Sequence, residues 1–251
     1  MINTDNQAIP VLDRSAYHPE EAFARDGFAG PYPILSTAEC DALIDHLTSR
    51  TLPAPLDWPK GRAATDRVLY EIAAAPRLIA LLRPLLGEDI ILWSAHVRRL
   101  VPGSHHPWHT DMESAATGSR AVSAWIGLRN TSRESGLRFV AGSHRFGRSV
   151  QEVTATLNLH RDAMTDAAVA DAAQRIDQSA RILEPDVSDG EALLFDGSIW
   201  HGGRNVGTRG VRTALLLQYA AADTPILMPV TRGYEWPFRY TTSPRVPAIL
   251  V

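Results

Sequence analysis

The spacing of apolar residues divides this chain into a helical N-terminal part and a β-rich remainder. Within residues 15–87 the apolar positions recur at helical spacing, as they do from Cys40 to Leu47. Ser36 and Glu39 stand at the spacing of a capping box just before this run, which marks the start of a helix. We therefore expect a layer of helices in the first third of the chain.

A second helical run, APRLIALLRPLLG, places leucines on one face from Leu78 to Leu85. Gly87 stands where a helix of this length would end. Pro84 weakens the last turn, because proline lacks the amide hydrogen that a helix interior uses. The pattern predicts a second amphipathic helix that ends near Gly87.

Beyond this helix the pattern changes to short apolar runs of strand length, separated by Gly, Pro, Asn and Ser. The runs are DIILWSAHVRRL, AVSAWIGL, GLRFV, ARILEPDV, EALLFDG and RTALLLQYA. No regular alternation of strands and helices is present, and no Gly-rich phosphate loop follows a strand, which argues against nucleotide-dependent enzymes. Helices followed by many short strands predict an antiparallel sandwich or barrel with a helical layer on one face.

We expect the whole chain, 1–251, to form a single domain, because it has no internal repeat and no Gly/Ser linker. Residues 152–179 are rich in Ala, Asp and Gln and carry only a weak helical pattern, so we expect an insertion that lies over the sheet. The tail from Asp223 is rich in proline and aromatic residues, which predicts an extended segment packed on the body. The insertion and the tail segment TRGYEWPFRY are candidate lids over a site.

Composition and charge exclude several classes of protein. The net charge of -3 gives no electrostatic basis for binding nucleic acid or an anionic membrane. No apolar run approaches the roughly 18 residues that a membrane helix needs. Cys40 is the only cysteine, so no disulfide can form within the chain and a cysteine-based zinc site is not expected. A reducing, cytoplasmic setting follows as the expectation, and it would suit a ferrous metal.

The stretch HPWHTDMES carries a histidine and an aspartate two positions apart. If this stretch is extended, as Pro107 favours, His109 and Asp111 point to the same face of a strand. Together they would offer a metal ion one imidazole nitrogen and one carboxylate oxygen. An isolated H-x-D triplet often arises by chance, so a metal site needs a third ligand from a distant part of the chain.

His201 is the best candidate for that third ligand. It follows the strand-like run GEALLFDGSIW and precedes GGRN, where glycines let the backbone come close to another group. The other histidines lie in the helical part, in the insertion, in a turn or too near His109: His18, His46, His96, His105, His106, His144 and His160. Two histidines and one aspartate leave metal positions open, which is typical of non-haem Fe(II) oxygenases.

Arg212 lies eleven positions beyond His201 and begins the apolar run RTALLLQYA. Burying an arginine there is costly unless it meets an anion, and its guanidinium fits a carboxylate with two parallel hydrogen bonds. Strand alternation places Arg212 on one face with Ala214, Leu216 and Gln218. We therefore expect Arg212 to hold an acidic co-substrate, whereas Arg204 and Arg209 are expected to be solvated in a turn.

The ordered set HTD, GLRFVAGSH, DGEALLFDGSIWHGGRN and Arg212 resembles the phytanoyl-CoA dioxygenase family of Fe(II)/2-oxoglutarate oxygenases. With FARDGFAGPYPILSTAECDALIDHL, the resemblance covers most of residues 20–220. It implies a mainly β fold, a double-stranded β-helix (a cupin-like jelly roll) with a helical layer. It also implies that His109, Asp111 and His201 are catalytic iron ligands.

By the same resemblance, Arg212 would bind the distal carboxylate of 2-oxoglutarate. The family reaction consumes O2, converts 2-oxoglutarate to succinate and CO2, and oxidises an unactivated C–H bond. Many relatives carry Ser or Thr where this chain has Ala214, so another residue must replace that hydroxyl. Gln218 and Trp125 are candidate co-substrate contacts, as is a residue of the strand that contains His96 and Arg98.

The resemblance also bears on the outcome of the reaction. Halogenating relatives have a small residue in place of the carboxylate, and Asp111 fills that position, which favours hydroxylation or a related desaturation, ring closure or epimerisation. The implied substrate is a small molecule, such as an amino acid, a natural product or an acyl thioester. Arg98, Arg99 and Arg138 are candidates to face an anionic one.

Two alternatives remain at this stage. The first is a jelly-roll metal-dependent enzyme, an isomerase or dioxygenase, that does not use 2-oxoglutarate. The second is a non-catalytic binding protein on the same scaffold. The tryptophans near the proposed ligands, including Trp93, Trp108 and Trp200, are expected to form core or pocket wall.

Overall fold

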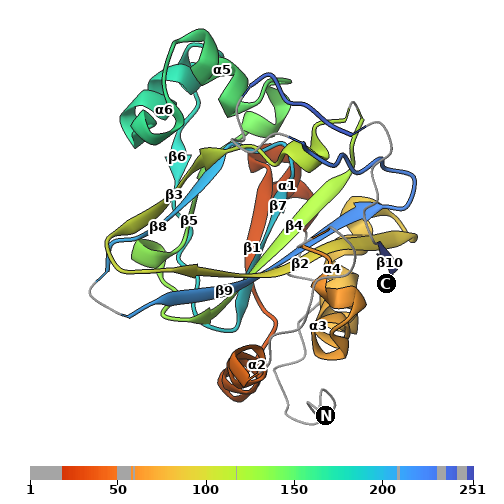
Figure 1. Cartoon of the computed structure of the whole chain (residues 1–251). Coiled ribbons are helices and arrows are strands. Elements are labelled where there is room, and N and C mark those ends of the chain that lie inside the picture. Colours follow the sequence, from red (N-terminus) through yellow and green to blue (C-terminus); the bar gives the residue numbers. More distant parts are fainter. Residues whose placement is uncertain are drawn as a thin grey trace.

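The computed structural model describes residues 19–49, 58, 60–116, 118–207, 210–230, 236–241 and 248–251. Two antiparallel sheets form its centre, and helices lie outside them (Figure 1). The larger sheet has the order β1-β7-β4-β9-β2-β10 and the smaller has the order β3-β8-β5-β6. The strands are β1 (Phe28–Pro33), β2 (Ile90–Leu100), β3 (Ser104–His109), β4 (Ala121–Arg129), β5 (Leu137–Val140), β6 (Ile182–Leu183), β7 (Glu191–Asp196), β8 (His201–Asn205), β9 (Arg212–Ala221) and β10 (Ile249–Leu250).

The two predicted N-terminal helices are present and begin and end as their sequences indicate. The α-helices are α1 (Pro19–Asp26), α2 (Thr37–Ser49), α3 (Arg67–Ala73), α4 (Pro76–Leu86), α5 (Val150–Thr156) and α6 (Asp166–Gln174). The capping box forms before α2: the Ser36 amide donates to Glu39 Oε2 at 2.7 Å, and the Glu39 amide donates to Ser36 Oγ at 3.3 Å. Gly87 follows α4 with a φ of 92°, which glycine adopts without steric cost.

The main apolar core lies between the larger sheet and helices α2, α3 and α4. Leu43, Leu69 and Leu82 come from these three helices and are fully buried. They share the cluster with Leu194 of β7 and Leu217 of β9. The helical layer expected on one face of the sandwich is therefore confirmed, and it leaves the opposite face of the larger sheet to line the space between the sheets.

A second apolar cluster fills part of that space. Phe139 of β5 and Phe195 of β7 come from different sheets, and their ring centroids are 5.4 Å apart. Trp125 of β4 and Leu216 of β9 belong to the same cluster. These residues separate the two sheets and leave the remaining interior positions to polar side chains.

The N-terminal zone was predicted to be mostly helical, and that prediction misses β1. The sequence FAGPYP has no alternating pattern, so the strand forms through its pairing with β7 at the edge of the larger sheet. Gly30 shows how close this approach is: a Cβ there would lie 2.7 Å from the carbonyl oxygen of Ala192. Only glycine fits at position 30, and no local sequence pattern predicts this contact.

Other expectations need smaller corrections. In the run ARILEPDV only Ile182 and Leu183 form a strand. The proposed turn arginine Arg204 is instead on β8, where its Nη2 lies 2.6 Å from Glu184 Oε2, so it is paired and not solvated. Arg209 lies outside the described residues.

The insertion forms two short helices that pack on the smaller sheet. Val150 and Val153 of α5 and Val169 of α6 share a buried cluster with Trp108 of β3 and Trp200. Figure 1 shows α5 and α6 above β6, at the end of the smaller sheet. The described part of the tail also packs on the body, and the segment 231–235 lies outside the described residues.

Candidate active site

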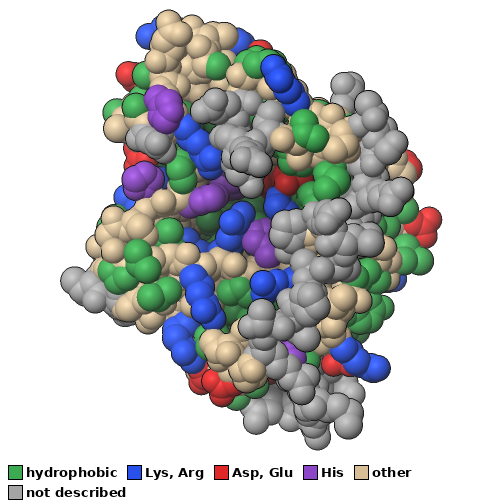
Figure 2. All heavy atoms as spheres, in the orientation of Figure 1, with side chains coloured by type: hydrophobic (Ala, Val, Ile, Leu, Met, Phe, Trp, Pro, Cys, Tyr) green, Lys and Arg blue, Asp and Glu red, His purple; other side chains and the backbone are tan. Residues whose placement is uncertain are grey.

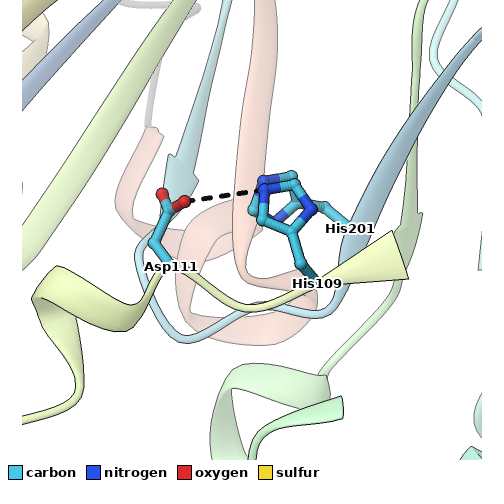
Figure 3. Close-up of side chains that lie close together, drawn as sticks. All are labelled: His109, Asp111 and His201. Atoms are coloured by element: carbon cyan, nitrogen blue, oxygen red, sulfur yellow. Dashed lines mark ion pairs between the residues drawn. The ribbon is translucent and has the colours of Figure 1, made fainter. Parts of the chain in front are cut away.

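Three side chains from distant parts of the chain meet between the sheets. His109 is the last residue of β3 and pairs directly with His201, the first residue of β8. Asp111 follows two positions later in extended backbone, with φ -66° and ψ 114°. The ligand atoms of His109, Asp111 and His201 all lie within 4.8 Å of one another, and all three residues are buried (Figure 3). The expected convergence of residue 201 on the H-x-D pair is therefore present.

The backbone fixes how both imidazoles face the centre. His109 Nδ1 lies 2.9 Å from the carbonyl oxygen of Pro107, and His201 Nδ1 lies 3.1 Å from that of Ile199. Each Nδ1 therefore carries the proton and donates it to a carbonyl two residues earlier, which leaves Nε2 as a lone-pair donor to a metal. Burial lowers the pKa of both histidines, so they are neutral, as metal ligands must be.

The carboxylate of Asp111 is held by two donors from the larger sheet. Gln218 Nε2 donates to Asp111 Oδ2 at 2.9 Å, and Ser123 Oγ donates to the same oxygen at 3.3 Å. Gln218 and Ser123 are direct partners in the register of β9 and β4. The other oxygen, Oδ1, lies 3.7 Å from His109 Nε2. Oδ1 of Asp111 is therefore free to face the centre, while Oδ2 accepts the hydrogen bonds from Gln218 and Ser123.

This arrangement gives Gln218 a contact that the sequence did not predict, because its amide nitrogen binds Asp111. The expected contact of Gln218 with the co-substrate stays a prediction. Its Oε1 is buried without a hydrogen-bond partner among the described residues. Ser123 was missed altogether, although its position two residues before Trp125 places both on the same face of β4.

Arg212 lies at the far end of the same inner face of β9. It is 3% exposed, and no acidic group among the described residues pairs with it. Its guanidinium carbon lies 5.2 Å from the centre of the Trp125 ring, so Trp125 contacts the proposed anchor directly. Burial, with the charge of Arg98, lowers the Arg212 pKa to about 10.

A buried guanidinium with no counter-ion indicates a missing anion. The Nε of Arg212 also has no partner among the described residues, which leaves a donor ready for an acceptor. Across the sheets, Gly203 of β8 lies beside the guanidinium, because a Cβ there would lie in van der Waals contact, 3.4 Å from Arg212 Nη2. These contacts fit a carboxylate anchor.

A cavity of about 110 Å³ reaches His109 and Asp111. Its charged and imidazole walls come from Lys60, Arg98, His106, Glu113 and Arg161. Figure 2 shows Lys, Arg and His side chains gathered near the middle of one face of the molecule. The opening to the metal ligands is thus bordered mainly by positive charge.

The three arginines predicted to face an anionic substrate have different positions. Arg138 is paired with Asp166, and its guanidinium carbon lies 5.0 Å from the centre of the Trp108 ring. Arg99 is exposed on β2. Arg98 alone of the three lines the cavity.

The remaining described histidines are not part of the centre, with one exception. His106 lines the cavity, and its ring meets that of His109 edge to face at 4.6 Å. His46 instead binds Asp66, and His96 Nδ1 lies 3.1 Å from Ser94 Oγ. His105, His144 and His160 do not belong to the group that could hold a metal ion, and His18 is outside the described residues.

Two neutral imidazole nitrogens and one carboxylate oxygen on one side of a centre form the donor set that Fe(II) takes in non-haem oxygenases. The residues present therefore fit a divalent iron with positions left open. The unpaired Arg212 on the same side of the larger sheet fits the free carboxylate of a diacid bound at those positions.

Comparison with known proteins agrees with this geometry. The family model described as phytanoyl-CoA dioxygenase (PhyH) matches residues 23–214. No curated protein matches the sequence. In the described residues, no helix is long and apolar enough to cross a membrane.

Several solved structures share the fold. HygX from Streptomyces hygroscopicus, with nickel and 2-oxoglutarate bound, has a TM-score of 0.63 at 17% identity, over 87% of this chain and 90% of that one. The epimerase SnoN, in complex with Fe3+, alpha ketoglutarate and nogalamycin RO, has a TM-score of 0.59 at 17% identity, over 80% and 82%. The non-heme monooxygenase ThoJ in its nickel complex has a TM-score of 0.57 at 20% identity, over 89% of each chain. The expected jelly-roll fold is therefore confirmed.

Proposed function

The chain belongs to the phytanoyl-CoA dioxygenase family, and on this premise we propose that it is an Fe(II)- and 2-oxoglutarate-dependent dioxygenase that hydroxylates a small molecule. The observation that carries the proposal is the convergence of His109, Asp111 and His201 with a buried, unpaired Arg212 on the same side of the larger sheet. We further propose that residues 1–251 act as one oxygenase domain in the cytoplasm.

His109 Nε2, His201 Nε2 and Asp111 Oδ1 would hold the iron. Iron, with 2-oxoglutarate and O2, supplies the oxidation of an unactivated C–H bond, and 2-oxoglutarate becomes succinate and CO2. Arg212 would receive the distal carboxylate of the co-substrate, with Trp125 packed against its guanidinium. This pairing would remove the cost of burying the arginine charge.

Hydroxylation is favoured over halogenation because Asp111 keeps one metal position filled by protein. Gln218 and Ser123 hold its second oxygen, so the carboxylate cannot turn away without losing two hydrogen bonds. The epimerase SnoN shares the fold, and its complex with nogalamycin RO supports a small-molecule substrate for this chain.

The proposal is tested by the visible charge-transfer band that forms when Fe(II) and 2-oxoglutarate are added without oxygen. Wild type should show the band, and His109→Ala and Asp111→Ala should abolish it. Arg204→Gln serves as a control, because Arg204 lies on β8 but pairs with Glu184 outside the site. A wild type without the band would refute the use of 2-oxoglutarate, and a ligand variant that keeps the band unchanged would refute the ligand assignment.

The same assay separates the two alternatives. A metal enzyme that does not use 2-oxoglutarate would bind Fe(II) but show no band, and its activity would survive Arg212→Gln. A binding protein would form the band yet release no succinate with any compound. The proposed enzyme forms the band and releases succinate when its substrate is added.

A further inference from the structure

Arg98 is the cavity residue that the proposed reaction leaves without a counter-ion. It lies directly across from Ala214 in the register of β2 and β9, and Ala214 belongs to the cluster between the sheets. The two side chains therefore share the inner face. Arg98 also lines the cavity that reaches His109 and Asp111.

Lys60 and Glu113, which also line the cavity, already form an ion pair with each other. No hydrogen bond or ion pair joins Arg98 to any other residue of the described part of the chain. Arg98 is half-buried, so water screens its charge only in part.

Binding of Fe(II) and 2-oxoglutarate would not neutralise the charge of Arg98. The two charges of Fe(II) and the charge of Arg212 are balanced by the carboxylate of Asp111 and the two carboxylates of 2-oxoglutarate. Each histidine would bind the metal through the lone pair of Nε2 and would add no charge. The charge of Arg98 remains beside a cavity that a substrate must enter to reach the open metal positions.

We propose that Arg98 binds an anionic group of the substrate, a carboxylate or a comparable oxyanion, and so orients the substrate over the metal. This inference rests on the proposed function and names the substrate class for the same site. Lys60 and Glu113 in the cavity wall neutralise each other, so the preference for an acid over a neutral or cationic molecule rests on the charge of Arg98.

The rival source of the anion is the co-substrate itself. The charge of Arg98 lowers the pKa of Arg212, so the two guanidiniums lie near each other. Two observations favour the substrate: Arg212 is 3% exposed and does not line the cavity, whereas Arg98 does. Arg98 is therefore accessible to a molecule in the cavity, whereas Arg212 is not among the residues that line it.

The first test measures 2-oxoglutarate affinity by titrating the charge-transfer band in Arg98→Gln, Arg99→Gln and Arg212→Gln. Arg99 is a matched control, because it is the exposed neighbour on the same strand. Arg212→Gln should weaken the affinity roughly 10- to 100-fold, the value of a charge-assisted contact. Arg98→Gln should stay within about threefold of wild type, as a residue that does not touch the co-substrate would. An Arg98→Gln loss equal to that of Arg212→Gln would assign Arg98 to the co-substrate and overturn the proposal.

The second test asks directly for an anion at Arg98. Crystals loaded with Ni(II) and 2-oxoglutarate are soaked in selenate, and its anomalous signal is located. A peak at the Arg98 guanidinium in wild type and Arg99→Gln, lost in Arg98→Gln, supports the proposal. No peak in wild type, or a peak that persists in Arg98→Gln as an adventitious ion only, overturns it.

A third test uses turnover on carboxylic acids, each paired with its own primary amide. Acids should stimulate succinate release, and Arg98→Gln should raise their KM roughly 10- to 100-fold while leaving the 2-oxoglutarate KM unchanged. An amide that works as well as its acid would overturn the inference. Failure of the proposed function looks different, because wild type would then either show no charge-transfer band or form the band and release no succinate with any compound.

Discussion

Replacing Gln218 by leucine should weaken metal binding without unfolding the protein. The substitution keeps the size of the side chain and removes the Nε2 donor that lies 2.9 Å from Asp111 Oδ2. Ser123 Oγ, at 3.3 Å, would remain as the only donor to that oxygen among the described residues. Asp111 would then be free to rotate its carboxylate away from the orientation that serves His109 and His201.

The size of the effect follows from the chemistry of the contact. A hydrogen bond to a charged group contributes about 1.5–3 kcal/mol, and partners of metal ligands typically change metal affinity about 10- to 100-fold. We expect Gln218→Leu to lie in that range. Ser123→Ala should cost less, because its contact with Asp111 is longer.

The stability of the metal-free protein should move little. Gln218 Oε1 is buried without a partner in the described structure, and an unpaired buried acceptor costs about 1–3 kcal/mol. Removing that acceptor offsets the lost contact with Asp111, so the free energy of unfolding should change by less than about 1 kcal/mol. A change of the same size in stability and in metal affinity would indicate a purely structural role.

The assay is competition for Co(II) against a coloured chelator, with thermal unfolding measured in the presence and absence of metal. Gln174→Leu is the control, since Gln174 donates to the carbonyl oxygen of Ala180 in the insertion and not to the centre. The reasoning is refuted if Gln218→Leu binds Co(II) within twofold of wild type while the unfolding temperatures agree.

Three further predictions test other parts of the structure. The affinity for 2-oxoglutarate should fall as the pH rises through about 10, because burial lowers the Arg212 pKa to about 10 and only the protonated guanidinium binds a carboxylate. Titration of the charge-transfer band measures this affinity, and an affinity that stays constant up to pH 11 would contradict the prediction. Tyr219→Phe should lower the free energy of unfolding by about 1–3 kcal/mol, as measured by denaturant unfolding. The Tyr219 hydroxyl donates to the carbonyl oxygen of Ala73 at 2.9 Å, and removing the hydroxyl leaves that carbonyl unpaired. Ser36→Ala should lower the free energy of unfolding by about 1 kcal/mol, because it removes one half of the capping box of α2. Ser179→Ala, at an exposed turn, is the control.

Local patterns were sufficient for much of the fold and for two of the three proposed metal ligands. The capping box of α2, the end of α4 at Gly87 and the shared face of His109 and Asp111 depend on residues close in sequence, so periodicity and turn chemistry predict them. His201 needed its spacing to Arg212 and the family resemblance, because the pairing of β3 with β8 that brings it to His109 is a long-range contact.

The parts that sequence did not predict depend on partners from elsewhere in the fold. Arg98 and Arg138 look alike as strand arginines, and only the position of Asp166 in the insertion separates them by pairing with Arg138. Ser123 is a small polar residue inside an apolar run, and its role depends on lying opposite Gln218. β1 likewise forms because β7 offers an edge to pair with.

Strand β9 links the two halves of the proposed site. Its inner face carries Gln218, which holds the proposed iron ligand Asp111, and Arg212, which would hold the far end of the co-substrate. Side chains alternate along a strand, so a slip of one residue would turn both away from the interior together. Pairing with β2 on one side and β4 on the other opposes such a slip. The register of one central strand therefore fixes the position of the metal relative to the carboxylate anchor, and with it the length of the diacid that the site accepts.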